Sequence, residues 1–121
     1  MGQNDAGNWR KEAEGYIESA AVLFRKGKYP QSLHHCYLAA QHALKACVLP
    51  SPSVLETVSL VVIAEKSGKQ WTTAQRELLL ELTECARALT DGDPHIIAFA
   101  VTKERCVRIL TLTAGLVSEL R

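Results

Sequence analysis

Arg87 and His95 are the two residues whose chemistry and spacing could serve a reaction on a phosphate. Attack of an RNA 2′-hydroxyl on the adjacent phosphate needs a base with a pKa near neutrality and a cation that stabilises charge on the phosphorane. An imidazole can act as the base and a guanidinium as the cation. His95 would therefore accept the proton, and Arg87 would stabilise the phosphate.

Arg87 and His95 also have an ordinary structural explanation. Arginine is favourable in the last turn of a helix, where the dipole attracts cations, and histidine is common in a polar loop. The turn between them is typical of one helix ending and another beginning: Gly92 adopts positive φ easily, Asp93 can cap a helix and Pro94 suits its first turn. If Pro94 begins a helix, the dipole at its N-terminus favours a neutral His95.

Apolar residues recur at helical spacing in five stretches, which predicts an all-α protein. The expected helices cover residues 8–27, 30–48, 54–68 and 71–89, followed by a last helix that reaches the C-terminus. The helix over 30–48 has the cleanest apolar stripe and small residues on its other faces, so we expect it at the centre. The prediction is one domain over residues 1–121, an up-and-down bundle of four long helices and one shorter helix.

The sequence also predicts where these helices begin. The expected N-caps of the first, third and fourth helices are Asn8, then Ser51 or Ser53, then Thr72 or Thr73. The third stretch could also be a buried strand, but a single strand would have no partner. The last helix begins at either Pro94 or Lys103. Its predicted buried side consists of Val107, Leu110, Ala114, Val117 and Leu120.

Composition excludes several classes of protein. Fourteen Lys and Arg residues against 13 Asp and Glu leave a formal net charge of +1, so the chain lacks the global field that drives nonspecific binding to nucleic acid. There is no P-loop, dinucleotide-binding glycine motif or nucleophile elbow. The first residues lack a signal-peptide pattern and no apolar run is long enough to cross a bilayer, which indicates a cytoplasmic protein.

Neither the cysteines nor the histidines have the spacing of a metal site. The four cysteines are well separated, without a C-x-x-C pair, and are expected to be reduced and mostly buried. His35 and His42 share a helix face, but about 10 Å of helical rise separates them, too far for one ion without a ligand from another helix. We interpret His34, His35 and His42 as solvent-facing or interface residues, and we expect no metal and no cofactor.

Five basic residues of the first and last helices could form a strip if those helices are adjacent: Arg10, Lys11, Lys103, Arg105 and Arg108. Lys103 and Arg105 do not share a helix face, and an acidic residue lies between them. We therefore expect an ordinary solvated surface.

Three motifs of the first two helices point to a known family. The first is the apolar series Trp9, Ala13, Ile17, Ala20 and Leu23. The second is GKY at 27–29, and the third is AAQHALKA at 39–46, which is similar to a family sequence of the form AAEKALKA. Together they resemble the HEPN family, the helical domains of higher eukaryotes and prokaryotes named for nucleotide binding, over most of the chain.

This resemblance implies a five-helix, bundle-like fold, commonly a homodimer, that often works beside a minimal nucleotidyltransferase in a toxin–antitoxin pair. Many family members are metal-independent ribonucleases, whose catalytic arginine is followed by a histidine at the junction of the last two long helices. The resemblance therefore implies catalytic roles for Arg87 and His95, which occupy that junction.

Three departures from the family pattern favour binding over catalysis. Residues 88–94 separate Arg87 from His95, one residue more than the catalytic pattern contains. An apolar pair follows Arg87 where members linked to a nucleotidyltransferase often have an aromatic residue. Gln41 and His42 stand where the family often has Glu-Lys, so an amide replaces one acidic side chain.

The interpretation that follows is a HEPN-like binding module, which pairs with a minimal nucleotidyltransferase or binds nucleotide or RNA in a toxin–antitoxin-like system. One alternative is a metal-independent endoribonuclease that uses Arg87 and His95. A second alternative is a purely structural dimerisation domain.

Overall fold

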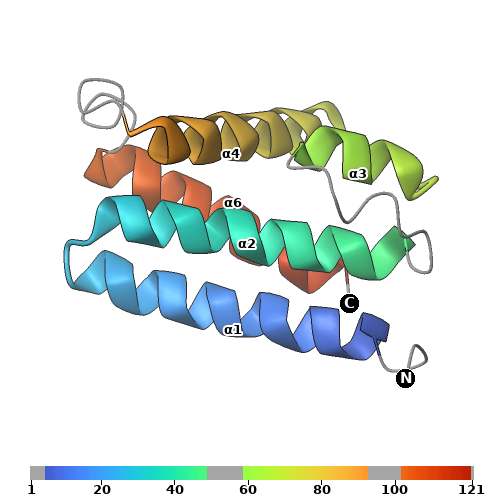
Figure 1. The fold of residues 1–121 in the computed structure, drawn as a ribbon, viewed down its shortest axis with the longest axis horizontal. Coiled ribbons are helices and arrows are strands. Elements are labelled where there is room, and N and C mark those ends of the chain that lie inside the picture. The colour runs from blue at the N-terminus through green and yellow to red at the C-terminus, as the bar shows by residue number, and fades with distance from the viewer. Residues whose placement is uncertain (1–4, 49–58, 93–101, 121) are drawn as a thin grey trace.

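A computed structural model describes residues 5–48, 59–92 and 102–120 of the chain. These residues form five α-helices (Figure 1). They are α1 (Asp5–Arg25), α2 (Tyr29–Val48), α3 (Leu60–Lys66), α4 (Thr73–Asp91) and α6 (Lys103–Glu119). The all-α prediction is confirmed, and the third apolar stretch contains a helix, not a strand. Within the described ranges, no helix has the length and apolar character needed to cross a membrane.

α2 lies at the centre of the bundle, as its apolar stripe predicts, and contacts α1, α3, α4 and α6. In Figure 1, α1 lies along one side of α2, α3 and α4 lie along the other, and α6 passes behind. Ala39, Ala40 and Ala43 are buried and small, so neighbouring helices can approach α2 on more than one side. The largest fully buried apolar side chains around them are Leu33, Leu44, Leu60, Ile63, Leu79, Leu82 and Ile109.

The connection between α1 and α2 is a tight helical hairpin. Gly27 has a φ of 75°, a conformation that costs glycine least. The Lys28 N–H donates to the Leu23 carbonyl at 2.9 Å, as in the Schellman pattern of helix C-termini. One turn into α2, the buried Ser32 hydroxyl donates to the carbonyl of Ala20 at 2.8 Å. The C-terminal half of α1 is therefore fixed on the first turns of α2.

α1 begins earlier than predicted, whereas α4 and α6 begin at predicted positions. Asn8 is not the cap of α1, because the helix starts at Asp5. Thr72 caps α4: its hydroxyl accepts from the Gln75 N–H at 3.0 Å, and its own N–H donates to Gln75 Oε1 at 2.8 Å. This is a complete capping box. α6 begins at Lys103, one of its two predicted starts.

α3 is shorter than predicted, and neither Ser51 nor Ser53 caps it. Its N-cap is Ser59, which has extended backbone angles. The next residue, Leu60, donates from its N–H to Thr83 Oγ1 of α4 at 3.1 Å. Because this hydrogen bond fixes where the first turn of α3 can form, the helix starts after the predicted serines.

The buried side of α6 agrees with the prediction at Val117 and Leu120 and differs from it at the other three positions. Val107, predicted as buried, is 42% exposed, and Leu110 and Ala114 are only half-buried. The buried positions are Cys106, Ile109, Thr113, Leu116, Val117 and Leu120. Thr113, in the middle of this face, makes the face look less apolar in the sequence than the face beside it. This explains why the sequence predicts the neighbouring positions as buried.

Candidate functional site

Arg87 lies close to the C-terminal end of α4 and is exposed. Gly92 ends this helix with a φ of 72°, as the predicted turn requires, and its N–H donates back into the last turn at 3.1 Å. His95, the predicted base, lies outside the described residues, as do Asp93 and Pro94. Of the two predicted site residues, Arg87 lies within the described part of the chain.

The positive charge of Arg87 on α4 influences the pKa of Tyr37 on α2. Tyr37 is buried, with 6% of its surface exposed, and Gln41, one turn along α2, donates from Nε2 to Tyr37 Oη at 3.4 Å. Burial raises the pKa of Tyr37 above its ordinary value, and the positive charge of Arg87 opposes part of this rise. The phenol is therefore neutral near pH 7. We call Arg87, Tyr37 and Gln41 the α2–α4 seam.

Arg87 has no ion-pair partner in the part of the chain that the structure describes. A guanidinium without a protein carboxylate keeps its N–H donors available for water or for an anion. Its planar fork matches two oxygens of a phosphate, which it can bind through parallel hydrogen bonds. Within the α2–α4 seam, the exposed guanidinium of Arg87 is the group whose chemistry suits an anion.

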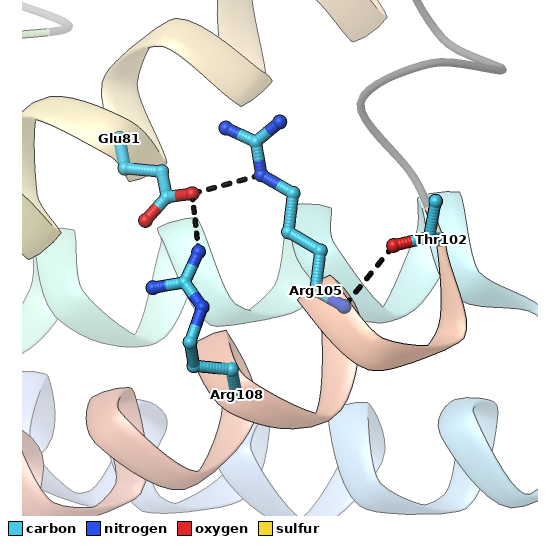
Figure 2. A network of polar contacts seen from close by, with 4 residues as sticks. All are labelled: Glu81, Thr102, Arg105 and Arg108. Carbon is cyan, nitrogen blue, oxygen red and sulfur yellow. Dashed lines mark hydrogen bonds and ion pairs between the residues drawn. The ribbon is translucent and has the colours of Figure 1, made fainter.

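A second group of charges lies where α4 faces α6. Figure 2 shows the side chains of Arg105 and Arg108 converging on one oxygen of Glu81. Arg105 Nε lies 2.8 Å from Glu81 Oε2, and Arg108 Nη2 lies 2.7 Å from the same atom. The Arg105 backbone N–H donates to the Thr102 hydroxyl at 3.1 Å, which caps α6 (Figure 2). We call Glu81, Arg105 and Arg108 the α4–α6 clamp.

The two arginines of the clamp share one carboxylate, that of Glu81. Burial disfavours the charge of Glu81, but hydrogen bonds from Arg108 and Arg105 outweigh burial and lower the pKa of this carboxyl below its ordinary value. The hydrogen bond between Arg108 and Glu81 also raises the pKa of Arg108. Arg108 is exposed, as expected for a solvated surface, whereas Arg105 is partly buried; the sequence did not predict that Glu81 pairs with both. Lys103 is exposed, as expected.

The three histidines of α2 lie in different environments. His34 is exposed, as predicted for a solvent-facing residue. His42 is only 9% exposed, because α1 covers it with the rings of Trp9 and Tyr16, at centroid separations of 4.8 and 5.1 Å. His42 is therefore buried between α1 and α2 and is not solvent-facing. Among the described residues, no three His, Cys, Asp or Glu side chains are grouped for a metal ion.

The cysteines are free thiols, and Cys36, Cys85 and Cys106 are buried, as predicted. Burial raises the pKa of all three, that of Cys36 to about 12. These groups stay protonated at neutral pH, so they lack the thiolate that nucleophilic chemistry needs.

Sequence reasoning did not identify Tyr37 or Glu81 as part of any site. Tyr37 belongs to the apolar stripe of α2, and only the polar residue one turn away, Gln41, marks this position as more than core. Glu81 is one of several acidic residues on α4, and its partners lie 24 and 27 residues further along the chain. No local spacing reveals such a contact.

Comparison with known protein families gives one clear match. The family model of the HEPN domain matches residues 6–92. The matched segment runs from α1 to the end of α4, so it includes the whole α2–α4 seam but not His95. Neither the curated proteins nor the solved structures provide a match to the chain. The resemblance found in the first two helices is therefore confirmed by the family model.

Proposed function

Because the chain belongs to the HEPN domain family, we propose that it is a binding module that holds a phosphate of a nucleotide or of RNA at Arg87. The observation that carries this proposal is the exposed Arg87 guanidinium, which has no carboxylate partner among the described residues. Arg87 also lies near the end of α4, the junction at which the family resemblance places its phosphate chemistry. Tyr37, whose pKa the charge of Arg87 influences, is neutral and adds no opposing charge.

The proposal predicts that Arg87 contributes to binding and that other exposed arginines of α4 do not. Labelled single-stranded RNA and labelled ATP are titrated separately with the protein at about 50 mM salt, where electrostatic contacts are strongest. Arg87→Ala should lower the affinity about tenfold, the effect of about one strong guanidinium–phosphate contact. Arg76→Ala is the matched control, because Arg76 is an exposed arginine at the other end of the same helix.

The two probes separate the two phosphate sources. Loss of affinity for RNA alone supports an RNA-binding module, and loss for ATP as well supports recognition of a nucleotide. Equal affinities of the wild type and Arg87→Ala for both probes would overturn the proposal, as would an equal loss in Arg76→Ala.

A metal-independent endoribonuclease is the second candidate function. It is favoured by the position of Arg87 in the last turns of α4, with His95 further along the sequence at the family's catalytic junction. Wild type and His95→Ala are incubated with RNA in EDTA. Cleavage that is lost in His95→Ala supports the enzyme, whereas binding without cleavage by either protein supports the binding module.

Family membership also supports two protein partners, a second copy of this chain and a minimal nucleotidyltransferase of a toxin–antitoxin-like pair. HEPN domains often dimerise. Sedimentation velocity over a range of protein concentrations tests the homodimer, and mass spectrometry of what co-purifies with the native protein tests the nucleotidyltransferase. A dimer that binds neither RNA nor ATP would instead support a structural dimerisation domain.

A further inference from the structure

A groove lies between the beginning of α4 and the end of α6. Its walls come from residues 72–78 of α4 and 111–119 of α6, and its volume is about 390 Å³. Leu78 and Leu116 line it and are buried, whereas Leu112 lines it and is 47% exposed. Among the large apolar side chains that are exposed in the described residues, Leu112 is the one in this groove. Leu112 is therefore an apolar side chain that its own chain leaves half in solvent.

Gly115 lies one turn beyond Leu112 in the same groove and is exposed. Glycine in the interior of a helix is less stable than alanine, so it is expected where a close approach needs it. A Cβ at position 115 would have no neighbour within 4 Å, so the described packing of this chain does not require a glycine there. The bare backbone instead leaves room for a side chain of another molecule.

These two residues belong to one stripe along α6. At about 100° per residue, positions 108, 112, 115 and 119 fall within about 60° of the helix circumference. We call these four residues the α6 stripe: Arg108, Leu112, Gly115 and Glu119. The stripe has a cation at one end, an anion at the other, and a large apolar residue beside a glycine between them.

Both charged ends of the α6 stripe can accept a further partner. The Arg108 side chain is 52% exposed and shares the carboxylate of Glu81 with Arg105. Glu119 is exposed and accepts a hydrogen bond from the neutral Gln75 Nε2 at 3.1 Å. It has no ion-pair partner among the described residues. A second molecule with the opposite order of charges would therefore complement the stripe.

We propose that the α6 stripe binds the same stripe of a second copy of this chain, in antiparallel orientation. This inference rests on the homodimer of the proposed function and names the surface that forms it. A two-fold axis at the middle of the stripe places Arg108 of one copy opposite the partner's Glu119. Because both pairs share one midpoint, the same axis places Leu112 opposite the partner's Gly115. A parallel arrangement would place like charges opposite each other, which is unfavourable.

Sedimentation velocity of the full chain over a range of concentrations tests this surface. Gly115→Glu fills the space opposite Leu112 with a charged side chain and should raise the dissociation constant of the dimer about tenfold. The variant should fold, because a Cβ at 115 meets no neighbour within 4 Å and glutamate favours helix. Gly15→Glu is the matched control: Gly15 is exposed in the interior of α1, its Cβ would also lie in open space, and the dissociation constant should not change.

Glu119→Gln tests the orientation of the two copies. In the antiparallel dimer it removes one ion pair at each end of the stripe, so it should raise the dissociation constant about fivefold. In a parallel dimer it would remove a repulsion and lower the dissociation constant. Glu65→Gln removes an exposed carboxylate from α3 and should have no effect.

The outcomes separate this surface from the rest of the proposed function. A dimer whose dissociation constant is unchanged in Gly115→Glu, or is lowered in Glu119→Gln, would overturn the α6 stripe as its interface and leave the homodimer standing. A wild type that stays monomeric at every concentration would overturn both the stripe and the homodimer. Phosphate binding at Arg87 is tested independently by the RNA and ATP titrations.

Discussion

The two sides of α4 use arginine in opposite ways. Where α4 faces α6, Glu81 binds Arg105 and Arg108 through one oxygen at 2.8 and 2.7 Å. Where α4 meets α2, Arg87 lies near a neutral phenol and has no carboxylate partner among the described residues. Glu81 and Arg87 are six residues apart, which places them about 120° apart around the helix axis. On one side, a carboxylate of α4 thus holds two arginines of α6, and on the other side α4 carries an exposed arginine with no carboxylate partner among the described residues.

This difference shows that the nearby counter-charge, and not the residue type, decides what an arginine does. The charges of the clamp form ion pairs that hold α6 against α4, so their role is structural. In the proposed function, the charge of Arg87 in the seam binds a ligand. The comparison therefore predicts that changes in the clamp lower stability, whereas changes at Arg87 lower binding.

The largest effect on stability should come from Glu81→Gln. Removing the carboxylate leaves two guanidinium groups facing each other without a counter-charge, at a site that is 19% exposed. We expect the free energy of unfolding to fall by about 1–2 kcal/mol, measured by urea denaturation. Glu84→Gln, at an exposed position of the same helix, is the control and should change it by less than about 0.5 kcal/mol. Equal losses in the two variants would show that the clamp has no special role.

The contribution of the clamp should disappear in acid. The pKa of Glu81 in the folded protein is lower than its ordinary value of 4.5, so the unfolded chain takes up this proton first as the pH falls. The stabilisation is therefore present above about pH 4.5 and is lost as the pH falls through the folded pKa. Urea denaturation at a series of pH values should show the wild type and Glu81→Gln converging below this range. A constant difference down to about pH 2 would mean that the charge of Glu81 is not what stabilises α6.

Single arginine substitutions should separate the two sides of α4 by a smaller margin. Arg108→Ala removes a half-exposed partner of Glu81 and should cost about 0.5–1 kcal/mol of unfolding free energy. Arg87→Ala should leave the unfolding free energy unchanged within experimental error, since no described hydrogen bond or ion pair is lost. A clear destabilisation by Arg87→Ala, measured by the same urea titration, would show that Arg87 has a structural role instead.

Much of the fold follows from local sequence signals. Helical periodicity is enough to identify the central helix, and Thr72 and Gly92 mark helix ends because a capping hydroxyl and a positive φ are local requirements. The register of α6 is not local: Thr113 is buried only because α6 packs on the rest of the bundle. Burial of a polar residue depends on its partners, and periodicity cannot report them.

The candidate site was predictable only in part, for the same reason. Arg87 could be found from its position before a turn, because a helix end is a local feature. Its lack of a counter-charge among the described residues could not be predicted, since that depends on where the carboxylates of other helices lie. The pairing of Glu81 with Arg105 and Arg108 likewise joins residues that are distant in sequence.

The salt dependence of RNA binding tests the central claim most directly. A cation that contacts one phosphate contributes about 0.7 to the slope of log affinity against log salt for single-stranded nucleic acid. The slope for Arg87→Ala should therefore be shallower than that of the wild type by about 0.7, while Arg108→Ala should keep the wild-type slope. An unchanged slope in Arg87→Ala, or an equal change in Arg108→Ala, would contradict the assignment of Arg87 as the phosphate-binding cation.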